Sequence, residues 1–93
     1  MSNVERMTDQ EMLGILRQLC SAYTMASMPG KEGALATFEV DSLEPLAKVI
    51  GKELHRRGGS REMLRVFNQL GPMPGRRTLE MLWGGLGYRD WQG

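Results

Sequence analysis

The segment Gly58-Gly59-Ser60 constrains the fold of this chain more than any other feature of its sequence. Two successive glycines end a helix readily, because glycine adopts the left-handed conformation at little cost, and serine often caps the next helix. On both sides of this segment apolar residues recur at three- and four-residue steps, which is the period of an amphipathic helix. The sequence therefore predicts helices over residues 42–57 and 60–70 that meet at a sharp corner.

The clearest start of a helix lies near the beginning of the chain. Thr8 is followed three residues later by Glu11, which is the pattern of a capping box at a helix N-terminus. An apolar stripe with helical spacing follows, and Pro29-Gly30 ends it, because proline disfavours helical geometry in the residue before it. We expect a helix over residues 9–27.

Residues 29–41 admit more than one interpretation. Ala36, Phe38 and Val40 alternate with polar residues, which is the period of a half-buried strand, but no second strand is visible to pair with it. The alternative is a short helix from Lys31 to Val40 with Leu35 and Phe38 facing inward. We expect an irregular but ordered connection in which Phe38 is the anchor.

The rest of the chain completes a helical bundle. The helix over residues 42–57 places Pro45 in its first turn, where the missing backbone N–H costs nothing. After a loop rich in glycine and proline, a short apolar segment predicts a fourth helix over residues 77–84. The remaining residues form a glycine-rich and aromatic tail without a regular pattern. The sequence thus predicts one all-α domain of about four helices spanning residues 1–93.

Charge is balanced over the whole chain, with a net charge of +1, but not along it. The first 45 residues carry a net charge of −4 and the remaining residues carry +5. We favour the interpretation in which the two halves attract each other, within one chain or between chains, over an anionic partner for the second half. The candidates for binding an anionic partner are the arginines around the glycine pair: Arg56, Arg57, Arg61 and Arg65.

The sequence contains no pattern that indicates catalysis or a bound cofactor. Cys20 is the only cysteine and His55 the only histidine, so the chain lacks the nitrogen and sulfur ligands of an ordinary zinc site. One cysteine also excludes an internal disulfide and favours a reducing compartment. We therefore predict no enzyme activity, no catalytic residue, no cofactor and no metal site.

The composition favours contacts with other proteins. Eight methionines are many for 93 residues, and flexible thioether side chains suit adaptable contact surfaces. A domain of this size also has a small core, so association would add to its stability. We expect a protein–protein interaction or regulatory module that forms a homodimer or binds another protein. The residues expected to contact an apolar partner are Phe38, Met73, Trp83 and Trp91.

Nucleic-acid binding is the alternative function. The corner at residues 58–60 superficially matches a helix-turn-helix, and the flanking arginines could contact phosphates. The helix over residues 60–70 is short for this role, however, and the sequence pI near 7.9 is modest. Because no apolar run is long enough to span a membrane and no signal-peptide core is visible, we expect a cytoplasmic protein without membrane contact.

Overall fold

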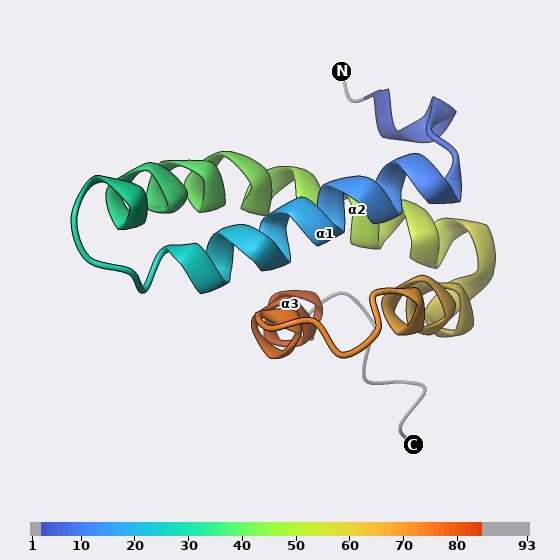
Figure 1. The fold of residues 1–93 in the computed structure, drawn as a ribbon. Helices are drawn as coiled ribbons and strands as arrows, with labels where there is room; N and C mark the ends of the chain where they lie inside the picture. Colours follow the sequence, from blue (N-terminus) through green and yellow to red (C-terminus); the bar gives the residue numbers. More distant parts are fainter. Residues whose placement is uncertain (1–2, 85–93) are drawn as a thin grey trace.

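The computed structural model describes residues 3–84, which form helices and the connections between them (Figure 1). The elements in chain order are the short 3-10 helix η1 (Asn3–Arg6) and the α-helices α1 (Asp9–Met25), α2 (Lys31–Gln69) and α3 (Arg76–Trp83). The all-α prediction is confirmed. The predicted number of about four helices is not, because three α-helices are present among these residues. The predicted glycine-rich and aromatic tail lies outside the described residues.

Helix α1 begins where the capping box predicts. The Thr8 backbone N–H donates to Glu11 Oε1 at 2.9 Å, and the Glu11 backbone N–H donates to Thr8 Oγ1 at 3.1 Å. These two bonds satisfy backbone donors that a helix N-terminus otherwise leaves without partners. The helix ends at Met25, slightly before the predicted end at residue 27.

Helix α2 corrects the prediction for residues 29–41, which are not an irregular connection. The helix begins at Lys31, directly after Gly30, whose φ of +79° favours glycine. Pro45 consequently lies inside the helix rather than in its first turn. Proline leaves the carbonyl four residues earlier without its helical partner, but Pro45 and Asp41 are both exposed, so water can hydrate that carbonyl.

The predicted break at Gly58-Gly59-Ser60 is present as a kink inside α2. Gly58 and Gly59 both have non-helical backbone angles, and Gly59 has φ +68° and ψ −160°, a conformation that essentially only glycine adopts. Figure 1 shows α2 changing direction here, so that its last turns and α3 lie below α1 in this view. The two predicted helices thus become two arms of one element.

The hydrophobic core lies where these arms, α1 and α3 come together. Trp83 is fully buried there, and its Nε1–H donates to the Ala47 carbonyl at 3.0 Å. Its ring centroid is 6.3 Å from that of Phe67, which the Arg76 guanidinium covers at 4.6 Å. In the part of the chain that is described, no helix is both long and apolar enough to cross a membrane.

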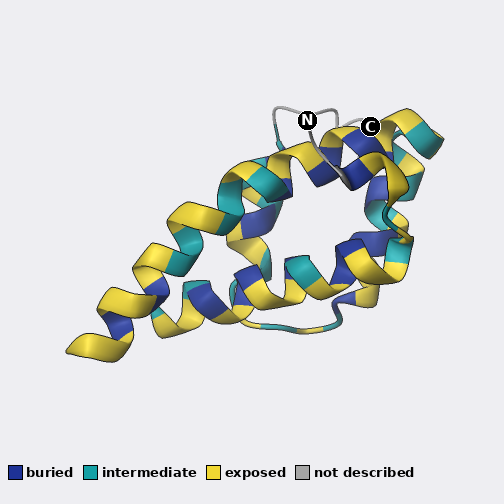
Figure 2. Cartoon of the chain, turned by 90° about the horizontal axis from the view of Figure 1, so that it is seen from above, coloured by how far each residue is buried: buried dark blue, intermediate teal, exposed yellow. Residues whose placement is uncertain are grey.

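The other end of the α1–α2 pair projects away from this core. Figure 1 shows the two helices running side by side to a tip, and the burial colouring of Figure 2 shows largely exposed residues at the far end of α2. Within residues 26–40 only Gly33 and Ala36 are buried. We call residues 21–39 the hairpin end. Few of its side chains contribute to the core, so its surface is open to other contacts.

Candidate protein-interaction surface

The predicted arginines surround the kink of α2, and we call Arg56, Arg57, Arg61 and Arg65 the arginine corner. Arg57 is the best bound of them. Its Nε donates to Glu53 Oε2 at 2.6 Å, its Nη1 reaches Asp9 Oδ1 at 3.3 Å, and its Nη2 donates to the Met7 carbonyl at 2.8 Å. Further bonds from Nη2 reach the carbonyls of Val4 and Glu5. Arg57 therefore holds the first residues of the chain against α2.

Glu53 is the carboxylate around which two of these arginines gather. It is 6% exposed and accepts hydrogen bonds from Arg56 Nε at 2.9 Å and Arg56 Nη2 at 2.6 Å, in addition to the bond from Arg57. Hydrogen bonds from Arg56 and Arg57 lower the pKa of Glu53 to about 2. A buried carboxylate is tolerated here because charged donors replace its water shell.

Arg65 is also paired. It donates to Glu62 Oε1 at 2.7 Å and forms an ion pair with Asp9. Its hydrogen bonds lower the pKa of Glu62. Asp9 belongs to the acidic first half of the chain and bridges Arg57 and Arg65 of the basic second half. Contact between the oppositely charged halves is thus seen at Asp9, whereas Glu53 and Glu62 lie in the basic half itself.

Arg61 is the exception in the arginine corner. It is exposed and forms no ion pair with any of residues 3–84. The other three arginines direct their guanidinium groups at carboxylates and carbonyls of their own chain. The arginine corner therefore mainly links the kink of α2 to the start of the chain. It is less an open cationic surface.

The predicted apolar contact residues lie in different places. Trp83 was expected at a binding surface but is fully buried, because its ring fills the core and its N–H has a backbone acceptor. Met73 is half-buried against the core. Trp91 lies outside the described residues. Phe38 is 73% exposed, so it is not the anchor of its segment but is available to a partner.

Phe38 shares the hairpin end with further exposed apolar side chains. Leu35 is 67% exposed one turn before it on α2, and Met25 and Met28 are 38% and 44% exposed on the other side of the tip. Leu35 was not among the residues predicted to contact a partner. The signal that could have found it is the helical spacing of Leu35, Phe38 and Val49, which share an exposed stripe once α2 is known to begin at Lys31.

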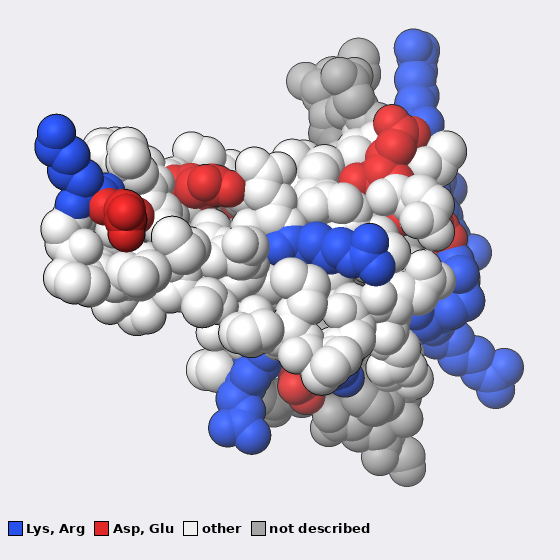
Figure 3. Space-filling view, in the orientation of Figure 1, with Lys and Arg blue, Asp and Glu red and all other residues white. Residues whose placement is uncertain are grey.

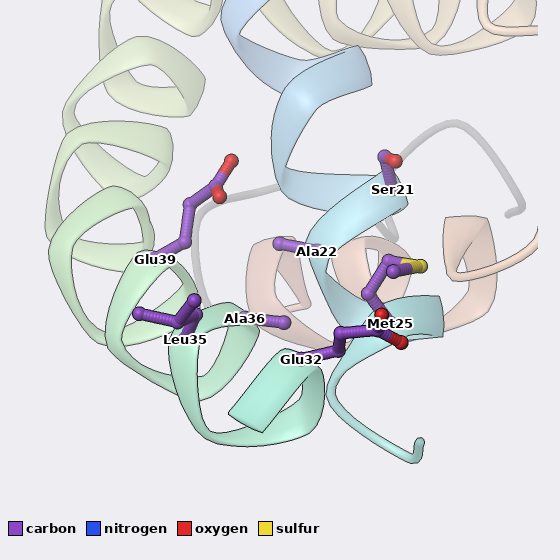
Figure 4. A pocket seen from close by; sticks show the side chains of 7 residues that line it. All are labelled: Ser21, Ala22, Met25, Glu32, Leu35, Ala36 and Glu39. Atoms are coloured by element: carbon purple, nitrogen blue, oxygen red, sulfur yellow. The ribbon is translucent and has the colours of Figure 1, made fainter. Parts of the chain in front are cut away.

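A groove of about 250 Å³ runs between α1 and α2 at the hairpin end, and we call it the hairpin groove (Figure 4). Ala22 and Ala36 lie between the two helices, and Met25 and Leu35 lie at its sides. The remaining lining residues are Ser21, Glu32 and Glu39. Small residues at its base allow side chains of another helix to enter between α1 and α2.

Carboxylates flank this apolar groove on the α2 side. Glu32 and Glu39 are seven residues apart, which is two helical turns, so they lie on the same side of α2. Glu39 accepts a hydrogen bond from Gln18 Nε2 at 3.1 Å, and Glu32 forms no ion pair with any described residue. Figure 3 shows the projecting part of the molecule as mostly uncharged surface with separate acidic groups and a basic side chain at its tip.

The hairpin groove thus combines an apolar lining with negative charge at one rim. Such a site suits an amphipathic helix that presents an apolar side chain beside a basic one. Comparison with protein-family models, with curated proteins and with solved structures finds no match to this chain.

Proposed function

We propose that this chain is a non-catalytic protein–protein interaction module that self-associates through its hairpin end. The observation that carries the proposal is the exposure of Leu35 and Phe38, at 67% and 73%, on neighbouring turns of a projecting helix. Contiguous exposed apolar side chains on a small domain are typical of interaction sites.

The expected gain from covering this surface is substantial. Burial of one leucine or phenylalanine side chain contributes about 1.5–3 kcal/mol, and an association of two copies covers several such side chains. Ordering of the interface and loss of free motion offset part of this gain. Association therefore requires that several such side chains of each copy are covered together.

The arginine corner supports the nucleic-acid alternative less well. Arg56, Arg57 and Arg65 each contact a carboxylate of their own chain, so phosphate groups would have to compete with these contacts. Leu35 and Phe38 of the hairpin end, by contrast, are mostly exposed in the described part of the chain. Protein association therefore explains more of the exposed surface.

Sedimentation equilibrium over a range of concentrations tests the proposal. We expect the wild-type chain to reach a mass above the 10.5 kDa of one chain, and the double variant Leu35→Glu/Phe38→Glu to stay at 10.5 kDa. Both side chains are exposed, so the variant should keep its helical circular dichroism. A wild-type chain that remains at 10.5 kDa at the highest concentration overturns the proposal.

Thr37→Glu is the matched control. Thr37 is exposed on the same part of α2, but it is two residues from Leu35 and therefore on a different side of the helix. This variant adds one negative charge, half of that in the double variant, without touching the apolar stripe, so it should associate like the wild type.

A further inference from the structure

Helix α3 also presents an exposed apolar side chain on its outer side. Met81 is 75% exposed, and Arg77 is exposed one turn before it on the same side of the helix. Leu79 and Trp83 are fully buried and hold the opposite side of α3 against the core. Arg77 forms no ion pair with any of the described residues. The outer side of α3 is therefore both basic and apolar.

The hairpin groove has the complementary properties. Its lining is apolar around Ala22 and Ala36, and Glu32 and Glu39 supply negative charge at one rim. From Lys31 to Glu44, α2 carries one lysine against four carboxylates, so the local charge around the groove is negative. A methionine side chain adapts well to an apolar groove, and a neighbouring arginine can pair with either carboxylate.

The α3 helix of the same chain lies on the wrong side of α1 to reach this groove. Gly75, directly before α3, packs against the Cys20 carbonyl and the Tyr23 side chain. Ser21 and Met25, which line the groove, are about 100° to 140° around α1 from Cys20. Figure 4 agrees, since α3 lies behind the helix pair when the groove is seen from the front. An α3 helix in the groove must come from another molecule.

We infer that the hairpin groove binds helix α3 of a second copy of this chain, with Met81 between α1 and α2 and Arg77 at Glu32 and Glu39. This inference rests on the proposed self-association and names its partner surface. If each copy supplies both surfaces, the contact forms twice in a closed dimer, as a two-fold symmetric assembly requires.

Charge reversal tests the inference, because the two surfaces can be changed separately. Arg77→Glu places negative charge opposite Glu32 and Glu39, and Glu32→Arg/Glu39→Arg places positive charge opposite Arg77. Each variant alone should associate at least roughly tenfold more weakly than the wild type. An equimolar mixture should recover association, because every contact in the mixed dimer again joins opposite charges. Sedimentation velocity with one variant fluorescently labelled measures this recovery.

Arg61→Glu is the matched control for Arg77→Glu, since Arg61 is also exposed and outside any ion pair with residues 3–84. It should associate like the wild type. Met81→Glu should weaken association without a change in helical circular dichroism, because Met81 is 75% exposed.

The outcomes separate the two proposals. A wild-type chain that is monomeric throughout overturns both self-association and this inference. A wild-type chain that associates, is weakened by Leu35→Glu/Phe38→Glu, but is unaffected by Arg77→Glu and Met81→Glu overturns the inference alone. Failure of the mixed charge-reversed variants to recover association likewise rejects α3 as the occupant, whereas full recovery supports it.

Discussion

At the scale of single residues, Arg57 and Glu53 explain why the arginine corner is internally bound. Arg57 joins Glu53, Asp9 and three backbone carbonyls near the start of the chain. A guanidinium suits this position because its donors point in several fixed directions and it stays charged at every ordinary pH. Glu53 in turn gives the half-buried guanidinium an opposite charge, so the pair depends on ionisation of the carboxylate.

The ion pair between Arg57 and Glu53 should make the stability of the fold depend on pH. The pKa of Glu53 falls from an ordinary 4.5 to about 2 on folding, so its contribution is complete above pH 4.5 and is lost as the pH falls toward 2. We expect urea midpoints to decrease between about pH 5 and pH 2. Glu53→Gln should lower the midpoint at pH 7 and make this decrease smaller.

Asp41→Asn is the control for this experiment, because Asp41 is exposed and forms no ion pair within residues 3–84. Its urea midpoint should decrease with falling pH as much as that of the wild type. The pKa values of Glu11 and Glu62 are also lowered, by hydrogen bonds from Thr8 and Arg65, so some decrease should remain in Glu53→Gln. If the urea midpoint of Glu53→Gln falls with pH as much as that of the wild type, Glu53 does not cause the pH dependence.

At the scale of elements, the kink at Gly59 should depend on glycine. Its φ of +68° and ψ of −160° are strained for any residue with a Cβ atom, although open space surrounds this position. Gly59→Ala should therefore destabilise the fold by about 1–3 kcal/mol. The cost arises from the backbone and not from a steric clash with a neighbouring side chain.

Gly14→Ala should change the free energy of unfolding in the opposite direction. Gly14 lies inside α1, is exposed and has no neighbouring atom that an added Cβ would meet. Alanine there should stabilise the fold by about 0.5–1 kcal/mol, because it restricts the unfolded chain and favours the helix. Chemical denaturation of both variants checks the pair, and a stabilising Gly59→Ala would contradict the assigned kink geometry.

Local signals in the sequence predict the elements that local chemistry determines. The capping box at Thr8 and Glu11 and the glycine pair at residues 58–59 predict the start of α1 and the kink of α2 because both act over a few residues. The segment 31–41 was ambiguous because Ala36 and Val40 fit two periods. They alternate with polar residues as in a strand, but as i and i+4 residues they also share the inner side of a helix.

The candidate site was less accessible to sequence reasoning. Phe38, predicted to contact an apolar partner, is accessible at 73% exposure, but it was also expected to anchor its segment, which this exposure contradicts. Trp83, predicted to contact the same kind of partner, is buried, and only the packing of α3 against Ala47 and Phe67 shows this. The hairpin groove arises where α1 and α2 meet, so no single segment of the sequence contains it.

At the scale of the whole molecule, the division of charge along the sequence does not become two opposed charged faces. Asp9 of the acidic half bridges Arg57 and Arg65 of the basic half, and Glu53 and Glu62 neutralise further positive charge beside the kink. Phosphate binding at the corner would have to displace these carboxylates from the arginines. Several charged hydrogen bonds would then be lost. The folded chain should therefore bind polyanions weakly despite its twelve lysines and arginines.

An electrophoretic mobility assay tests this expectation at low ionic strength, where phosphate contacts are strongest. Mixed-sequence DNA and RNA should migrate unchanged at about 50 mM salt with excess protein. Arg61 is the corner residue that forms no ion pair with residues 3–84, so Arg61→Glu is the informative variant. A shift that disappears both in Arg61→Glu and at higher salt would assign nucleic-acid binding to the corner. A shift that Arg61→Glu leaves unchanged would place the phosphate contacts elsewhere on the chain, because reversing an exposed charge at a phosphate site must weaken binding.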